Sequence, residues 1–253
     1  MTKIRLPAVA GQFYPAEPER LKEQVNAFLQ AAPSIKISGK LRALIVPHAG
    51  YVFSGPVAAV GYKLLKKARL KKPEILLLGS SHHHSLNQPV GASFTAWQTP
   101  LGQVKAKNLT EFDVFDQAHL DEHSLEVQLP FLQQSLEEFR IIPLLLNHFN
   151  AQLVDILSNL INQIRFIIVS SDLSHYHNYD QAVAIDSLAN QVIPQLDFDR
   201  AGKIEACGLG AILTLIKLAQ QKGWQAKLLD YKNSGAFGDK TRVVGYGCYG
   251  FFE

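Results

Sequence analysis

Short apolar runs that end in histidine, or in serine and aspartate, recur along this chain of 253 residues. These runs are residues 44–47 before His48, residues 75–81 before His82, and residues 167–171 before Asp172 and His175. Short runs rich in leucine and β-branched residues predict the buried strands of a parallel sheet. Because ligands bind beyond the carboxyl ends of strands in open α/β sheets, we expect at least three strands to bring imidazole groups to one edge.

Strand and helix patterns alternate along the chain, which predicts a three-layer α/β/α sandwich around a mostly parallel or mixed sheet. No linker or repeat divides the sequence, so we expect a single domain over residues 1–253. The last strand is expected to enter the sheet by a hairpin-like return, and Pro143 predicts an edge strand or a bulge. The expected helices are 17–31, 57–67, 121–138, 151–161, 180–192 and 208–221, and the expected strands are 40–46, 74–78, 139–146, 165–169, 226–229 and 243–252.

The charge and composition of the chain argue against nucleic-acid and membrane partners. The formal net charge is only +3, and the cations between Lys63 and Lys72 are interpreted as a helix C-terminus, where they complement the dipole. No aromatic residues interleave with them, so we expect no nucleic-acid partner. There is no signal-type apolar core and no apolar run of about 20 residues, so we expect a cytoplasmic protein that does not span a membrane.

The two cysteines do not form a disulfide framework. Cys207 precedes an apolar helix and Cys248 alternates with other residues on the last expected strand, so both are interpreted as packing residues.

The histidines that follow strands point to a polar site, because imidazole is the commonest metal ligand and acid–base group near neutral pH. Asp172 stands three residues before His175 and could orient its ring, as carboxylates near metal sites do. His123 and Glu126 would share a helix face. His148 and His177 are expected to be peripheral.

Taken together, nine segments resemble the Memo family, the protein B group of a three-protein system. Those segments are residues 7–15, 46–55, 77–83, 99–102, 121–132, 141–146, 170–175, 206–208 and 243–247. The resemblance implies a fold similar to that of class III extradiol dioxygenases, which use non-haem iron. It also implies a metal held by His48 and His82, acid–base roles for His123 and His175, and support of His175 by Asp172.

The resemblance places the third metal ligand in the loop before the last strand, where animal members have a cysteine and the dioxygenases a glutamate. Neither occurs at residues 231–239, and Asp239 is the one carboxylate between Tyr231 and Val243. We therefore expect either Asp239 or a water molecule to complete the site around a divalent metal, with iron favoured and zinc or copper as alternatives.

Three functions remain open from the sequence. A metal-dependent redox enzyme of unknown substrate is favoured, with His123 and His175 moving protons. Metal-assisted hydrolysis and a non-catalytic module that binds a peptide or a partner are the alternatives, since a shared fold does not fix a reaction. The ligand is an unknown small molecule or peptide, and the resemblance adds the radical-SAM protein of the same system as a partner.

Overall fold

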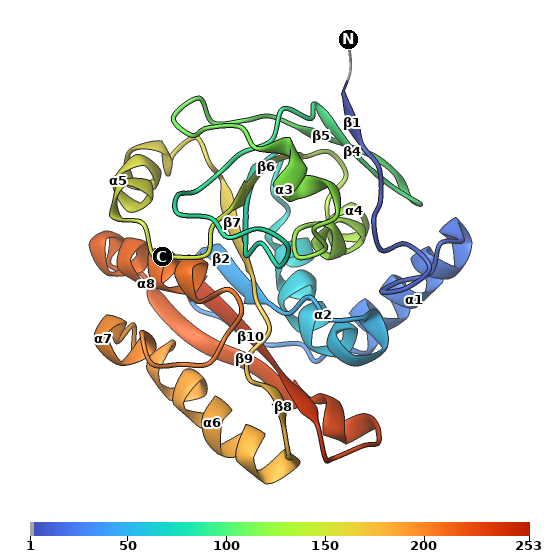
Figure 1. The fold of residues 1–253 in the computed structure, drawn as a ribbon, viewed down its shortest axis with the longest axis vertical. Coiled ribbons are helices and arrows are strands. Elements are labelled where there is room, and N and C mark those ends of the chain that lie inside the picture. Colours follow the sequence, from blue (N-terminus) through green and yellow to red (C-terminus); the bar gives the residue numbers. More distant parts are fainter. Residues whose placement is uncertain (1–2) are drawn as a thin grey trace.

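The computed structural model describes residues 3–253 and contains a mixed sheet that is covered by helices on both faces (Figure 1). Its strands lie in the order β1-β4-β5-β6-β3-β7-β2-β10-β8, and β9 pairs with β10. The predicted α/β sandwich is therefore confirmed. Within the described residues, no helix is both long and apolar enough to cross a lipid bilayer.

Four parallel strands form the centre of the sheet: β6 (Arg140–Leu145), β3 (Glu74–Gly79), β7 (Phe166–Ser170) and β2 (Leu41–Val46). Leu78 pairs with Val169, and Val46 pairs with Ser170. This register brings the carboxyl ends of β3, β7 and β2 to one edge of the sheet, as the sequence predicts.

The outer strands make the sheet mixed. On one side, β10 (Val243–Phe252) runs antiparallel to β2, to β9 (Gln225–Asn233) and to β8 (His175–His177). The predicted hairpin return of the last strand is therefore confirmed. On the other side lie β5 (Gly102–Ala106), β4 (Ala96–Thr99) and β1 (Ile4–Arg5).

Two apolar cores lie on opposite faces of the sheet, because successive side chains of a strand point to opposite sides. On β2, Leu44 and Val46 face one core while Ala43 and Ile45 face the other. The first core is covered by α1 (Pro18–Ala31), α2 (Tyr51–Ala68) and α4 (Leu129–Ser135). The second is covered by α5 (Ala151–Leu160), α6 (Tyr179–Val192) and α8 (Leu209–Lys222), while α3 (Asp116–Leu120) and α7 (Phe198–Ala201) are short.

The prediction of a single helix over residues 121–138 is wrong. A 3-10 turn, η1 (Glu126–Gln128), leads into the shorter α4, and the residues before it are irregular. The buried carboxylate of Glu122 explains this path, because it accepts hydrogen bonds from the backbone N–H groups of both Ser124 and His82. The chain is thereby tied to the loop after β3 instead of to its own helix.

Pro143 lies on an inner strand, without the predicted bulge. Its partner in β3 is Leu77, and the register is continuous on both sides of this pair. On the opposite side, β5 pairs only with Arg140 and Ile141 of β6. The strand therefore tolerates proline beyond the end of β5, where one side of the ladder is open.

A buried ion pair joins the N-terminal strand to η1, directly after the irregular segment. Arg5 and Glu126 are both fully buried and their charged groups are in direct contact. Arg5 also donates to the carbonyls of His119 (Nε, 3.0 Å) and Glu122 (Nη2, 2.5 Å). The Glu126 carboxylate in turn accepts three further hydrogen bonds, from Ala8 N, Val9 N and the Tyr14 hydroxyl.

We predict that Arg5→Met lowers the free energy of unfolding by about 3–5 kcal/mol, because it leaves a buried carboxylate without its cation. Urea denaturation measures the change. Lys3→Met is the matched control, since Lys3 pairs with Asp116 at the surface and exposed pairs contribute less than about 1 kcal/mol. Equal, small losses in the two variants would contradict the prediction.

A buried carboxyl group links α6 to the hairpin. Asp186 accepts hydrogen bonds from Ser174 N (3.0 Å) and from the Tyr231 hydroxyl (2.8 Å). Burial raises its pKa above the ordinary value of 3.8, although both hydrogen bonds oppose the rise. A raised carboxyl pKa means that the folded state favours the protonated form, so this stabilisation is present below pH 3.8 and is lost as the pH rises through the folded pKa.

We predict that Asp186→Asn becomes more stable relative to the wild type as the pH rises from acid to neutral. The amide stays uncharged, can accept from Ser174 N–H and can donate to the Tyr231 hydroxyl. Urea denaturation of both proteins across this range measures the difference in free energy of unfolding. A difference that stays constant or shrinks with rising pH would show that ionisation of Asp186 does not lower the stability of the folded protein.

Candidate functional site

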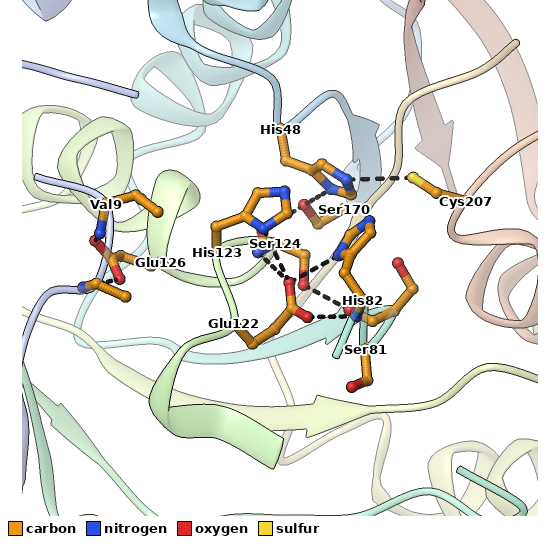
Figure 2. Close-up of polar contacts among 12 residues, drawn as sticks. Val9, His48, Ser81, His82, Glu122, His123, Ser124, Glu126, Ser170 and Cys207 are labelled. Atoms are coloured by element: carbon orange, nitrogen blue, oxygen red, sulfur yellow. Dashed lines mark hydrogen bonds and ion pairs between the residues drawn. The ribbon is translucent and has the colours of Figure 1, made fainter. Parts of the chain in front are cut away.

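The loops after β2 and β3 and the segment before α8 meet at one edge of the sheet (Figure 2). They carry His48, His82 and Cys207, whose ligand atoms all lie within 4.8 Å of one another. The ring centroids of the two histidines are 5.2 Å apart, and Nε2 of His48 lies 3.2 Å from Sγ of Cys207. Two imidazoles predicted to converge are therefore joined by a thiol that the sequence assigned to packing.

His48 is buried and held at three points. Its backbone N–H donates to Oδ1 of Asp172 at 2.7 Å, and its Nδ1 lies 2.9 Å from the Ser170 hydroxyl. Its Nε2 is the atom that faces Cys207. Because Ser170 and Asp172 are at and just beyond the end of β7, this strand sets the position of a histidine that β2 delivers.

His82 is held by Glu122. The carboxylate accepts the backbone N–H of His82 at 2.6 Å and its Nδ1 at 2.9 Å, and also the backbone N–H of Ser124 at 2.8 Å (Figure 2). A histidine whose Nδ1 donates to a carboxylate presents its Nε2 for metal binding, and this pairing orients the ring and raises its basicity. Glu122 is thus placed where an outer partner of a metal ligand would be, with the Nε2 of His82 left available.

Cys207 stands just before α8, where a helix N-terminus stabilises a thiolate. Its Sγ accepts the backbone N–H of Asp172 at 3.2 Å. A Cβ added at Gly208 would lie 2.6 Å from the Cβ of Ser171, so glycine is required for this close approach. Burial by itself would raise the pKa of the thiol, but the neighbouring charges of His48 and His82 lower it well below 9.0.

The thiolate and the two imidazoles stabilise one another's charges. Burial would lower the pKa of both rings, yet Cys207 and Asp172 raise that of His48 to about 9, and Cys207 and Glu122 raise that of His82 to about 10. Burial opposes the ionisation of Glu122, but its hydrogen bonds to His82 lower its pKa to about 2. In the metal-free protein, protons on the imidazoles thus neutralise the charges of the thiolate and the carboxylate. A bound divalent cation could neutralise these charges in place of the protons.

His123 lines the open side of the cluster. Its ring centroid is 4.5 Å from that of His82 and 4.8 Å from that of Phe13. Burial and the adjacent His48 lower its pKa to about 3, so the ring is neutral at physiological pH. Its side chain and that of His82 are 17% and 30% exposed, which makes this side the route by which a ligand can reach the site.

Two groups of residues within the described chain could hold a metal ion: His48, His82 and Cys207, and His82, Glu122 and His123. In the second group, both Glu122 oxygens and the Nδ1 of His82 are already engaged in hydrogen bonds. In the first group, the Nδ1 atoms are engaged while both Nε2 atoms remain available. The first group therefore fits a metal better, and two imidazoles with one thiolate form a donor set that suits zinc or copper.

The structure does not bring Asp239 to this cluster. Tyr249 pairs with Ile45 on β2, so Val243 lies six residues further along β10, about 20 Å past that point. Asp239 is beyond Val243, where it is exposed and accepts hydrogen bonds from Thr241 N and Oγ1 at 2.8 and 2.7 Å. Cys207, which comes from a different loop, thus takes the place of Asp239 as the candidate third ligand.

Asp172 does not support His175 through a hydrogen bond of its carboxylate. Oδ1 of Asp172 accepts the backbone N–H of His48 instead. His175 is on β8, where its backbone N–H donates to Glu205 at 2.9 Å and its ring packs at 5.8 Å from that of Tyr176. The structure therefore places His123, and not His175, against the two metal-ligand candidates.

Sequence reasoning missed Cys207 and the carboxylate of Glu122 as parts of the site. The signal for Cys207 was its position directly before an apolar helix, which favours a thiolate as much as a packing residue. Glu122 was grouped with acids at a helix start, because the expected helix began at residue 121. Neither role can be assigned without knowing which loops lie beside the histidines.

The fold and the site define an α/β protein with a histidine- and cysteine-lined cluster at the carboxyl edge of its sheet. A family model described as "Memo-like protein" matches residues 5–249. MEMO1 family proteins of Sulfolobus acidocaldarius and Saccharolobus solfataricus are each 35% identical, over 96% of this chain and 97% of theirs. A MEMO1 family protein of Nitrosopumilus maritimus is 33% identical, over 98% of this chain and 99% of its own. The chain belongs to the Memo family.

We predict that iodoacetamide modifies Cys207 rapidly in the native, metal-free protein and leaves Cys248 unmodified. Cys207 is partly exposed with a lowered pKa, whereas Cys248 is fully buried and burial raises the pKa of its thiol. Mass spectrometry of digested protein identifies the modified thiol, and urea-unfolded protein is the control in which both react. Equal modification of the two cysteines under native conditions would refute the prediction.

Proposed function

We propose that this protein is a metal-dependent oxidoreductase whose metal is held by His48, His82 and Cys207. The observation that carries the proposal is that the two nitrogens of each imidazole have different partners. Each Nδ1 is engaged, by Ser170 or by Glu122, and the Nε2 of His48 faces a thiol with a lowered pKa. This arrangement is typical of histidines prepared to bind a metal.

The donor set favours copper over the iron that the sequence suggested. Iron was expected on the basis of a carboxylate ligand, Asp239, which lies elsewhere. Thiolate is a soft donor that selects copper or zinc, while imidazole accepts either. When bound, copper would supply one-electron redox chemistry, which zinc cannot.

The protein's own groups would bind and orient a substrate on the exposed side of the cluster. The neutral His123 ring can donate or accept a hydrogen bond there, and Phe13 packs against it and restricts its orientation. Glu122, buried and ionised, keeps the His82 ring in place. An acid–base role for His175 remains a prediction from the sequence.

We predict that protein purified anaerobically without an affinity tag contains near-stoichiometric metal, and that His48→Ala/His82→Ala contains none while remaining folded. Cys207→Ala should bind copper at least tenfold more weakly, because it loses the soft donor. Asp239→Asn is the matched control and should retain full metal. Elemental analysis and a copper titration measure these outcomes.

Other results would overturn the proposal. Loss of metal in Asp239→Asn together with full metal in Cys207→Ala would refute the ligand assignment. Zinc alone, with no oxygen-dependent turnover after copper loading, would favour metal-assisted hydrolysis. If the wild type takes up no metal even after reconstitution, the site would be better explained as a binding site for a peptide or partner.

A further inference from the structure

The Nδ1 atoms of the two candidate histidine ligands contact different kinds of group. His82 donates to a carboxylate, whereas His48 lies against the Ser170 hydroxyl, which is itself bonded to the Gln128 amide. We propose that Ser170 and Gln128 are positioning residues that hold His48 in the tautomer with its proton on Nδ1, which leaves Nε2 free for the metal. The use of that free Nε2 rests on the proposed function, whereas the tautomer itself does not.

The direction of the first hydrogen bond follows from a backbone carbonyl. The Ser170 Oγ lies 2.6 Å from the carbonyl oxygen of Ser124, which can only accept. Ser170 must therefore donate its single hydroxyl proton to Ser124. Any other partner of the Ser170 oxygen has to be a donor.

The orientation of the Gln128 amide is determined in the same way. Its Nε2 lies 3.0 Å from the carbonyl oxygen of Pro47, an obligatory acceptor, and its Oε1 accepts from the Tyr62 hydroxyl at 2.8 Å. The same Nε2 lies 2.8 Å from the Ser170 Oγ. Gln128 therefore donates to both Pro47 and Ser170 and occupies one lone pair of the Ser170 hydroxyl.

The remaining lone pair of Ser170 faces Nδ1 of His48 at 2.9 Å. Because the Ser170 proton is committed to Ser124, this contact is a hydrogen bond only if Nδ1 carries a proton. All three side chains are at least 98% buried, so water does not offer an alternative partner. The other nitrogen, Nε2, then holds the lone pair in a neutral ring. It is the atom that faces Cys207, whose thiolate competes with Ser170 for the ring proton when no metal is bound.

A neutral support distinguishes His48 from His82. A carboxylate partner raises the basicity of a ligand imidazole, and a serine hydroxyl does so much less. The chain thus supports Nδ1 of His48 without placing a carboxylate against that nitrogen. Removal of Ser170 would leave a buried Nδ1–H without an acceptor, and the ring would be free to place its proton on Nε2 instead.

Nitrogen-15 NMR of histidine-labelled, metal-free Cys207→Ala protein tests the tautomer directly, at a pH at which His48 is neutral, because this background removes the thiolate that would otherwise accept a proton from Nε2. We expect the Nδ1–H form in Cys207→Ala and a shift toward the Nε2–H form when Ser170→Ala is added. Ser54→Ala is the matched control: its hydroxyl is equally buried and donates to the Ala49 carbonyl at 2.6 Å, but it does not contact an imidazole. An Nε2–H form in Cys207→Ala, or an unchanged tautomer after Ser170→Ala is added, would overturn the proposal.

Titration with Co²⁺, followed by the thiolate charge-transfer band, tests the consequence for metal binding. Ser170→Ala should bind Co²⁺ about tenfold to a hundredfold more weakly than the wild type, while Ser54→Ala should bind normally. Gln128→Met should weaken binding less, and it should add nothing in the Ser170→Ala background, because it acts through Ser170. Additive losses in the double variant would refute the role of Gln128.

The two experiments separate the inference from the proposed function. If Cys207→Ala has the Nδ1–H tautomer but the wild type binds no metal, the positioning network stands and the metal-dependent function fails. If metal binds but the tautomer is Nε2–H, the function stands and the network fails.

Discussion

The buried contact between Arg5 and Glu126 is the interaction on which the arrangement of the site depends. It neutralises two charges that are inaccessible to solvent, and both partners are further satisfied by backbone groups. Breaking one partner of such a pair leaves an uncompensated charge, which is strongly destabilising. The pair fastens the N-terminal strand to Glu126, directly after the irregular segment that carries Glu122 and His123, so these side chains meet the histidines that follow β2 and β3 in a defined geometry.

The cluster at the sheet edge combines rigid strands with loops that are fixed by buried polar bonds. The strands set the spacing of His48 and His82, because their carboxyl ends are in register. Glu122, in an irregular segment, and Ser170, the last residue of β7, then decide which nitrogen of His82 and of His48 faces the centre. Buried polar networks of this kind specify one arrangement only when every member is satisfied.

Much of the fold was predictable because it follows local patterns. The run of apolar residues in each central strand predicts burial on both faces, and the histidines that follow two of these strands were correctly expected at one edge. The helix expected over 121–138 failed, because its apolar spacing resembles a helix while Glu122 bonds to a loop 40 residues away. Asp239 was chosen as the only acid in its segment, but the length of the β9–β10 hairpin carries it past the site.

The sequence by itself determined the layered α/β architecture and the pair of histidines at the strand ends, since both depend on periodicity and on the direction of parallel strands. Tertiary structure alone decided which thiol joins the two histidines and which nitrogen of each ring faces it. Cys207 is 159 residues from His48 along the chain, yet its sulfur lies 3.2 Å from the ring. Contacts at such separations depend on how loops pack, and no local pattern of residues encodes that packing.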